Sequence, residues 1–145
     1  MFDLSDRVAI VTGGAQGVGG GISRILARAG AKVLIADIDI DMARNTEELI
    51  CKNSGIAESL KIDVTSYEDL KNMVEVANDH WGRLDILINN AYAAADGQQG
   101  GALEVTEERW ESDIRALVTS VYAGSKYAIP LMQKTGGGSI VNISS

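Results

Sequence analysis

The stretch Val8–Gly21, VAIVTGGAQGVGGG, constrains the fold of this chain more than any other. Its first five residues are apolar or β-branched, which favours a strand buried on both faces. Glycines follow at once, and after them apolar residues recur at helical spacing as far as Gly30, a typical helix stop. A strand, a glycine turn and a helix in this order leave backbone N–H groups free at the helix start, where the helix dipole favours an anion. The stretch therefore predicts a phosphate-binding turn.

A second predicted strand, Ala31–Asp37, follows this helix and ends in an acid. Asp37 follows Gly19 at the distance at which a dinucleotide-binding βαβ unit places the carboxylate that binds the adenosine ribose. The same acid would also suit the N-cap of the next helix, a task that we assign to Asp39. Asp37 is therefore the predicted ribose ligand, and a purely structural turn is the weaker interpretation of the glycines.

The spacing of the glycines indicates which kind of nucleotide loop this is. No Gly-Lys-Ser/Thr follows, which excludes a P-loop, and Ile22 stands where a strict G-x-G-x-x-G motif needs its last glycine. The arrangement that is present resembles the cofactor loop of the short-chain dehydrogenase/reductase family. The resemblance implies that the dinucleotide is bound here by Thr12, Gly13, Gln16, Gly17, Val18 and Gly19.

Predicted strands and helices alternate along the rest of the chain. The further elements are a helix over Asp41–Asn53, a strand over Ser59–Val64, a helix from a capping box at Thr65–Glu68 to Gly82, a strand over Leu84–Asn89, a long helix over Thr106–Gln133 and a strand over Ser139–Ser144. With 145 residues the chain is one domain in size. We expect an α/β fold of three layers, a Rossmann-like doubly wound parallel sheet with strand order 3-2-1-4-5.

Apolar spacing also predicts which helix faces are buried. Pro130 lies within the long helix and is expected to kink it or end it early. The residues predicted to face inward are Met42, Leu49 and Ile50 in the second helix, Leu70, Met73, Val74 and Ala77 in the third, and Ile114, Leu117, Val118, Val121, Tyr122, Ala128, Ile129 and Met132 in the long helix.

The composition narrows the range of partners. A net charge of −7 at pH 7 argues against nucleic acid, which requires a basic face. No basic leader precedes an apolar run, and no apolar stretch approaches ~18 residues, so we expect neither export nor membrane insertion. Cys51 is the single cysteine and His80 the single histidine. These counts favour a reduced, cytoplasmic setting and no metal site.

Three further segments are similar to motifs of the same family, in the same order. Asp63-Val64 resembles its adenine-side dipeptide, Asn89-Asn90-Ala91 its motif after the fourth strand, and Ile140–Ser145 the strand that carries its catalytic serine. The resemblance covers the whole chain. It implies that Asp63, Val64, Asn90 and Ala91 bind cofactor and that Ser145 orients the substrate. It also implies a homodimer or homotetramer built through the long helix.

The chain departs from the family pattern at three places. Tyr92 replaces a glycine after the fourth strand, which is expected to re-route the backbone there, and Leu117 replaces the asparagine of the long helix. The family's Tyr-x-x-x-Lys pair lies beyond the serine, where this sequence stops. We therefore expect an N-terminal fragment that does not turn over by itself. Tyr122 and Lys126 have the same spacing but precede the serine, so we interpret Tyr122 as core packing.

The expected reaction is hydride transfer between NAD and a small secondary alcohol or ketone. NADP carries a phosphate on the ribose oxygen that Asp37 is expected to contact, and like charges repel. Family members that take NADP commonly have a basic residue in the glycine loop or after the second strand, where this chain has Gln16 and Ile38. We therefore expect NAD in preference to NADP. Asp37→Ala should narrow this preference, mainly by weakening the repulsion.

Two other function classes remain open. A catalytically silent dinucleotide-binding sensor or interaction module would use the same fold, and Leu117 in the asparagine position favours it. A flavodoxin-like or methyltransferase-like sheet also uses glycine turns and ribose acids, but Asn89-Asn90-Ala91 and the serine strand have no task there. A Tyr-x-x-x-Lys pair soon after Ser145 in the parent coding sequence would favour the enzyme over the silent module.

Overall fold

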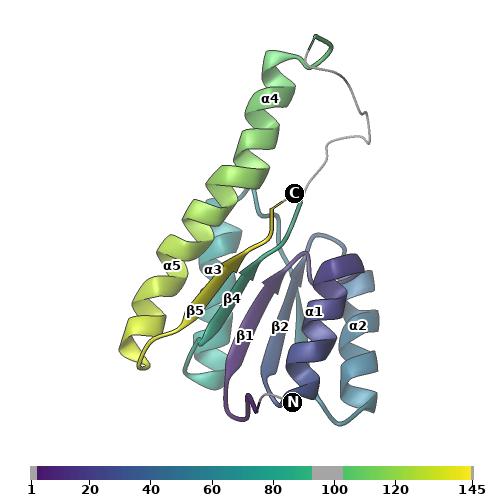
Figure 1. Ribbon diagram of the computed structural model, residues 1–145, viewed down its shortest axis with the longest axis vertical. Coiled ribbons are helices and arrows are strands. Elements are labelled where there is room, and N and C mark those ends of the chain that lie inside the picture. Colours follow the sequence, from purple (N-terminus) through teal and green to yellow (C-terminus); the bar gives the residue numbers. More distant parts are fainter. Residues whose placement is uncertain (1–2, 93–102, 145) are drawn as a thin grey trace.

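The computed structural model describes residues 3–92 and 103–144 and contains one parallel sheet in the order β3-β2-β1-β4-β5 (Figure 1). This order confirms the predicted doubly wound, Rossmann-like topology. The strands are β1 (Val8–Thr12), β2 (Lys32–Asp37), β3 (Ile56–Lys61), β4 (Ile86–Asn89) and β5 (Ser139–Asn142), and the helices are α1 (Gly17–Arg28), α2 (Ile40–Lys52), α3 (Tyr67–Trp81), α4 (Glu107–Ile114), a π-helical turn η1 (Arg115–Thr119) and α5 (Ser120–Lys134).

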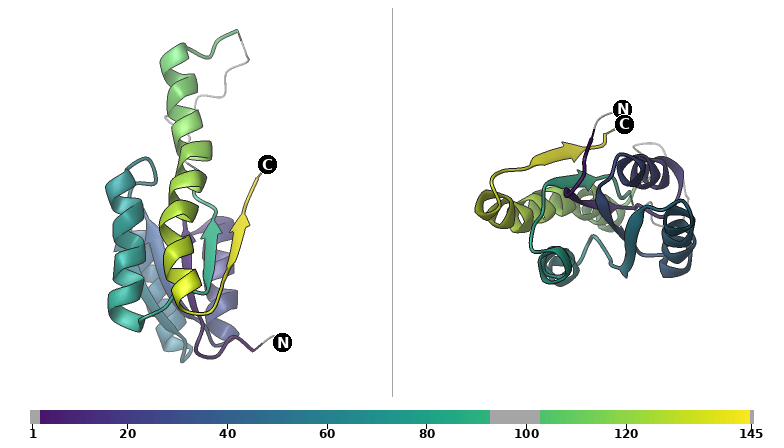
Figure 2. Two further views of the ribbon diagram at one scale, coloured as in Figure 1. Left: turned by 90° about the vertical axis from the view of Figure 1, so that its left-hand side faces the viewer. Right: turned by 90° about the horizontal axis from the view of Figure 1, so that it is seen from below.

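Helices cover the sheet on both faces, with α1 and α2 on one side and α3 and α5 on the other (Figure 2). Each core strand contributes side chains to the apolar layers on both faces of the sheet, because successive side chains point to opposite faces. In β1, Val8 and Ile10 pack toward α3 and α5, whereas Ala9 and Val11 pack toward α1 and α2. All four side chains are fully buried. The run of apolar residues before the glycines is therefore the central strand of the domain.

The third strand begins three residues earlier than predicted and spans Ile56–Lys61 instead of Ser59–Val64. Its register against β2 runs from Ile56 opposite Lys32 to Lys61 opposite Asp37. Beyond this point Ile62 and Val64 are buried in the loop at the carboxyl end of the strand, which explains their apolar character. Apolar residues in this loop were thus mistaken for part of the strand.

The cap of α3 also differs from the prediction by one residue. Ser66, and not Thr65, accepts the Asp69 N–H at 3.2 Å. The Thr65 hydroxyl instead donates to Asp63 Oδ1 at 2.7 Å. In the same helix Leu70, Met73, Val74 and Ala77 are buried, as predicted.

In α2 the predicted inward face is wrong at two of its three positions. Met42 and Leu49 are 36% and 46% exposed, whereas Ile50 is buried. The face that contacts the rest of the domain consists of Ala43, Thr46 and Ile50. Ala43 and Thr46 of this face are small, and the Thr46 hydroxyl contacts the glycine loop.

The long helix runs from α4 through η1 into α5, and its predicted buried stripe is mostly wrong. Ala128 and Met132 are buried, but five others of the predicted set, Ile114, Leu117, Val118, Tyr122 and Ile129, are exposed by 37% to 58%. Most residues of the inward face are small, so the helix lies close to the sheet. It consists of Ala116, Ser120, Ala123, Gly124, Ala128, Leu131 and Met132.

Pro130 neither ends nor shortens α5, because the helix continues to Lys134. Tyr122 is 57% exposed, so its interpretation as core packing is wrong. The α4 end of the long helix projects beyond the sheet in Figure 1. The described residues include no helix that is long and apolar enough to cross a membrane.

Candidate functional site

A pocket of about 460 Å³ lies at the carboxyl ends of the central strands. Here the chain crosses from one face of the sheet to the other, since β1 lies between β2 and β4, and such a switch point is the usual ligand site of doubly wound sheets. The pocket is lined by Gly13, Gln16, Val18, Gly19, Ala36, Asp37, Ile38, Asp39, Ile62, Asp63, Val64, Asn90, Ala91 and Tyr92. It thus gathers every predicted cofactor residue except Thr12 and Gly17.

Gly13 and Gly19 are among the glycines of the loop that have no room for a side chain. A Cβ on Gly19 would lie 2.0 Å from the Gly13 carbonyl oxygen, and a Cβ on Gly13 would lie 2.9 Å from the Ala91 Cα. Gly13 also has φ +62°, in the left-handed region that side-chain-bearing residues rarely adopt. The end of β1, the start of α1 and the end of β4 are therefore packed together at backbone distance.

Side chains bind the carbonyl oxygens of four consecutive loop residues, Thr12 to Ala15. Asn90 donates through Nδ2 to the Thr12 and Gly13 carbonyls at 3.0 and 3.2 Å. The Ser23 hydroxyl donates to the Gly14 carbonyl at 3.1 Å, and the Thr46 hydroxyl donates to the Ala15 carbonyl at 2.6 Å. The Gly13 and Ala15 N–H groups also bond within the protein, to the Ala36 carbonyl and to Asp37, so the donors that suit an anion are those at the start of α1.

Helix α1 begins without a cap, in contrast to the other helices that start from extended backbone. Asp39, Ser66 and Thr106 each accept an N–H of the helix that they precede, in α2, α3 and α4. Gln16 stands before α1 and makes no side-chain bond of this kind, and the first turn of α1 holds no acid. The start of α1 therefore keeps both its free N–H groups and its positive dipole end directed at the pocket.

Asp37, the last residue of β2, also lines the pocket and accepts two backbone N–H groups. Its Oδ2 accepts from Ala15 at 3.0 Å and its Oδ1 from Asp39 at 3.1 Å. Asp63, in the loop that follows β3, accepts the Thr65 N–H and hydroxyl through Oδ1, at 2.8 and 2.7 Å. Both carboxylates are therefore held in place by neighbouring backbone.

Thr12 lies behind the loop rather than in the pocket, and only 2% of it is exposed. Its hydroxyl accepts the N–H groups of Asn90 and Ala91 at 3.0 and 3.1 Å and lies 3.3 Å from the Ile88 carbonyl, to which it donates. Thr12 thus joins the end of β1 to the end of β4. Thr12 therefore holds Asn90 and Ala91, which line the pocket, and does not line it itself.

Asn89 was not predicted as a site residue, yet it connects three elements beside the serine strand. Its Nδ2 donates to Asn142 Oδ1 at 2.9 Å in β5 and to Ser125 Oγ at 3.5 Å in α5. The sequence does contain a signal for this contact, because β4 ends in Asn89 and β5 ends in Asn142. Ser145 itself lies outside the described residues, as does the predicted loop over Ala93–Gly101.

The departures from the family pattern have different structural outcomes. Tyr92 is 63% exposed at the pocket, and the only described non-glycine residues with positive φ are Asp6 and Ser54, so Tyr92 occupies an ordinary backbone conformation. Leu117 lies in the π-helical turn and is 44% exposed. Lys126 Nζ lies 5.7 Å from the Tyr122 ring centre, and neither residue lines the pocket. The described residues contain no group of three metal-ligating side chains.

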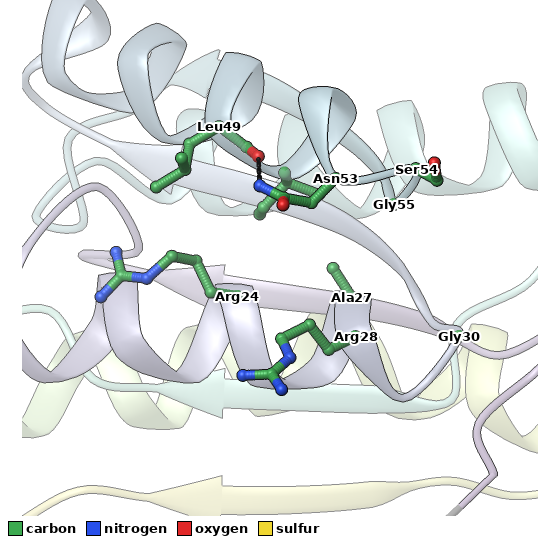
Figure 3. A pocket seen from close by; sticks show the side chains of 9 residues that line it. Arg24, Ala27, Arg28, Gly30, Leu49, Asn53, Ser54 and Gly55 are labelled. Atoms are coloured by element: carbon green, nitrogen blue, oxygen red, sulfur yellow. Dashed lines mark hydrogen bonds between the residues drawn. The ribbon is translucent and has the colours of Figure 1, made fainter.

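A second hollow, of about 710 Å³, separates α1 from α2 away from the glycine loop (Figure 3). Across it, Arg24 and Arg28 of α1 face Leu49 of α2 and Asn53, which follows α2. None of its lining residues comes from the carboxyl edge of the sheet. Ligands of doubly wound sheets bind at that edge, so the smaller pocket is the candidate site.

The sequence from residue 7 to residue 145 matches the family model of the short chain dehydrogenases. The chain belongs to this family. The family assignment agrees with the glycine loop, with Asp37 at the end of β2 and with the Asn89-Asn90-Ala91 motif at the end of β4, and residues of all three line the pocket.

Individual relatives show how much of the family domain is present. An uncharacterized oxidoreductase of Thermotoga maritima is 37% identical over 142 residues, which are 98% of this chain and 54% of that protein. A 2,5-dichloro-2,5-cyclohexadiene-1,4-diol dehydrogenase of Sphingobium indicum is 36% identical, over 98% of this chain and 56% of its own length. The solved structure of a 7α-hydroxysteroid dehydrogenase in complex with NADH and 7-oxo glycochenodeoxycholic acid superimposes with a TM-score of 0.92 at 31% identity, covering 99% of this chain and 55% of that one. The chain thus spans about half the length of the relatives it matches.

Proposed function

We propose that this chain is the dinucleotide-binding part of an NAD-dependent dehydrogenase that moves a hydride between NAD(H) and a small secondary alcohol or ketone. The observation that carries the proposal is the pocket beside the uncapped start of α1, where side chains bind the loop carbonyls and the Asp37 carboxylate lines the same pocket. This arrangement offers N–H donors to a pyrophosphate and a carboxylate to a ribose. A solved relative is named as an NADH complex, which supports the same class of cofactor.

The residues present fit a dinucleotide in a way that a purely structural turn does not require. Gly19 and Gly13 bring the loop backbone into contact, and Gln16 leaves the helix start without a cap. We assign Gln16, Gly17, Val18 and Gly19 to the pyrophosphate, Asp37 to the adenosine ribose, Asp63 and Val64 to the adenine side, and Asn90 and Ala91 to the nicotinamide side.

When bound, the nicotinamide supplies or accepts the hydride, while the protein orients the substrate and moves a proton. In this chain we assign the orientation of the substrate oxygen to the Ser145 hydroxyl. Asn89 and Asn142 form a hydrogen-bonded pair next to that strand end and fix β5 against β4. The proton step in the family belongs to its Tyr-x-x-x-Lys pair, and Tyr122 with Lys126 does not replace it because neither lines the pocket.

Asp37 is the basis for proposing NAD over NADP. Two unit charges ~4 Å apart repel by about 4 kcal/mol at an effective dielectric constant near 20. Even if solvent screening halves this energy, the cofactor preference is at least about tenfold. Among the described residues, the pocket lining contains five acid or amide side chains, from Gln16, Asp37, Asp39, Asp63 and Asn90. It contains no described lysine or arginine that could neutralise a ribose phosphate.

The direct test is a pair of dissociation constants for NADH and NADPH, measured by the enhancement of nicotinamide fluorescence. The proposal expects NADH to bind at least about tenfold more tightly. Equal affinity would overturn the assignment of Asp37, and a lack of binding by either cofactor would overturn the dinucleotide site as a whole.

A silent dinucleotide-binding module is the second candidate, favoured by Leu117 in the position where the family has its asparagine. Both candidates expect NADH binding, but only the enzyme expects turnover in the full-length parent. Oxidation of secondary alcohols with NAD, followed at 340 nm over a broad substrate panel, separates the two.

We also propose that the long helix pairs with a second copy of the chain. Apolar residues at spacings of three and four form an exposed stripe along α4, η1 and α5, made of Trp110, Ile114, Leu117, Val118 and Tyr122. Contiguous exposed apolar surface of this kind marks an interaction site. Such pairing would form a homodimer, or a homotetramer if a second interface is used.

A further inference from the structure

Thr46 lies in the middle of α2, outside the glycine loop and the pocket lining, and is 7% exposed. Its hydroxyl donates to the Ala15 carbonyl oxygen at 2.6 Å across 31 positions of the chain. A threonine inside a helix commonly bonds back to a carbonyl of its own preceding turn. The Thr46 hydroxyl instead donates to a carbonyl of the glycine loop, outside its own helix.

The peptide between Ala15 and Gln16 is therefore fixed from one side. A peptide unit is planar and trans, so its C=O and N–H point in opposite directions. Because Thr46 holds the Ala15 carbonyl, the Gln16 N–H must point away from α2. Gln16 has φ −145° and ψ −179°, stands directly before α1 and lines the pocket.

Ala15 is held at its other polar group as well. Its N–H donates to Asp37 Oδ2 at 3.0 Å, so β2 and α2 each bind one end of the same residue. Ala15 is 3% exposed and packs in the apolar layer with Ala43 and Ile50. In that layer the Thr46 hydroxyl is a polar group that apolar packing alone does not require.

We infer that Thr46 is a positioning residue for dinucleotide binding: through the Ala15 carbonyl it orients the Gln16 N–H toward the cofactor phosphates. The inference rests on the proposed function, because it concerns the same pocket. According to this inference, α2 also shapes the phosphate site, although the sequence motifs of the loop do not include any residue of α2.

The test compares ADP with adenosine, which lacks the phosphates but keeps the ribose and adenine. Thr46→Val keeps the shape of the side chain and removes the hydroxyl, whereas Thr46→Ser keeps the hydroxyl. Loss of one hydrogen bond that positions a phosphate ligand should weaken ADP binding by about fivefold in Thr46→Val. Adenosine binding should change less than about twofold, and Thr46→Ser should bind ADP like the unmodified protein. Dissociation constants come from calorimetry for ADP and from NMR titration for adenosine.

Thr46→Ala serves as a second variant because it places no methyl group against the Ala15 carbonyl, and it should show the same selective loss. Unchanged ADP affinity in both hydroxyl-free variants would overturn the inference. An equal loss for ADP and adenosine would also overturn it, because that result indicates general loosening of the domain. If the unmodified protein binds neither ADP nor NADH, the dinucleotide site itself fails and this inference fails with it.

Discussion

The Asp37 carboxylate accepts the Ala15 N–H at 3.0 Å, so the predicted ribose ligand also holds the glycine loop in place. Its other oxygen accepts the Asp39 N–H at 3.1 Å. A carboxylate offers about four lone-pair sites, and two of them are used here, which leaves capacity for ribose hydroxyls. The acid at the end of β2 thus has a structural task besides the one that the sequence motif indicates.

Because Asp37 has both a charge and a hydrogen bond to the loop, two substitutions at this position should have different effects on cofactor binding. Asp37→Asn removes the charge but keeps an oxygen that can accept the Ala15 N–H. We expect it to reduce the preference for NADH over NADPH by about tenfold, since the repulsion of the ribose phosphate is lost. Asp37→Ala also removes the acceptor of the Ala15 N–H and should therefore weaken the binding of both cofactors. The expectation that the alanine variant acts mainly through charge is therefore revised.

The measurement is the ratio of the NADPH and NADH dissociation constants in each variant. Asp41→Asn is the matched control, because it removes one negative charge from the exposed start of α2 without touching the loop. A control ratio that shifts as far as that of Asp37→Asn would mean that the general field of the protein, and not Asp37, sets the preference.

Two glycines of α1 provide a second test of the loop. A Cβ on Gly19 would lie 2.0 Å from the Gly13 carbonyl oxygen, whereas a Cβ on Gly21 meets nothing within 4 Å. We expect Gly19→Ala to displace the loop and to weaken NADH binding by more than about tenfold. Gly21→Ala should bind NADH normally and stabilise the protein by up to about 1 kcal/mol, because alanine favours the helix.

Thermal unfolding and NADH titration of both variants, made side by side, check this pair of expectations. Normal NADH affinity in Gly19→Ala would show that the contact between the two loop segments is not needed for the site.

The sequence was sufficient to predict the strand order and most of the pocket. Parallel strands buried on both faces are continuous apolar runs, and the glycine loop, Asp37 and the asparagines lie at the strand ends where the topology brings them together. The positions of these residues in the chain determine which edge of the sheet they occupy. For that reason motif spacing succeeded here.

The helix faces could not be predicted in the same way. Gly124 lies so close to β4 that a Cβ there would be 2.9 Å from Asn89 Oδ1, so this part of the helix can present only a small residue to the sheet. The larger apolar side chains Val118 and Tyr122 then point outward. Apolar periodicity cannot distinguish a face buried in the domain from a face that is exposed to pair with another chain. Long-range partners such as Thr46 and the Ala15 carbonyl also leave no spacing signal.

The exposed stripe on the long helix leads to a third prediction. Val118→Glu places a charge in the middle of it, at a side chain that is 58% exposed. We expect this variant to shift the protein from an oligomer to a monomer, because an unpaired charge is costly inside an apolar interface. Light scattering after size-exclusion chromatography measures the mass directly.

Ile25→Glu is the control for this experiment, since Ile25 is 65% exposed on α1, on the other side of the sheet. It should leave the mass unchanged. If the unmodified protein is a monomer, or if both substitutions change the mass equally, the exposed stripe is not the site of pairing.

The fourth prediction concerns Asp85, which joins the chain before β1 to the start of β4. Its side chain is 6% exposed and accepts bonds from Arg83, from the Val8 N–H and from Arg7. Burial raises the pKa of this carboxyl, but the bonds from Arg83, Val8 and Arg7 more than offset it and lower the pKa to about 2. The carboxylate therefore has a stronger set of partners in the folded protein than in the unfolded chain.

The direction of the pH effect follows from this lowered pKa. A group whose pKa is depressed by folding stabilises the protein above its unfolded pKa, near 4, and this stabilisation is lost as the pH falls toward 2. From the size of the shift we expect Asp85→Asn to cost about 2 kcal/mol at pH 7 and about half as much at pH 3. Asp79→Asn, an exposed position on α3, should cost little at either pH. Urea unfolding of the three proteins at both pH values gives these differences. If Asp85→Asn costs the same at pH 3 as at pH 7, the contribution of Asp85 comes from packing and not from its charge.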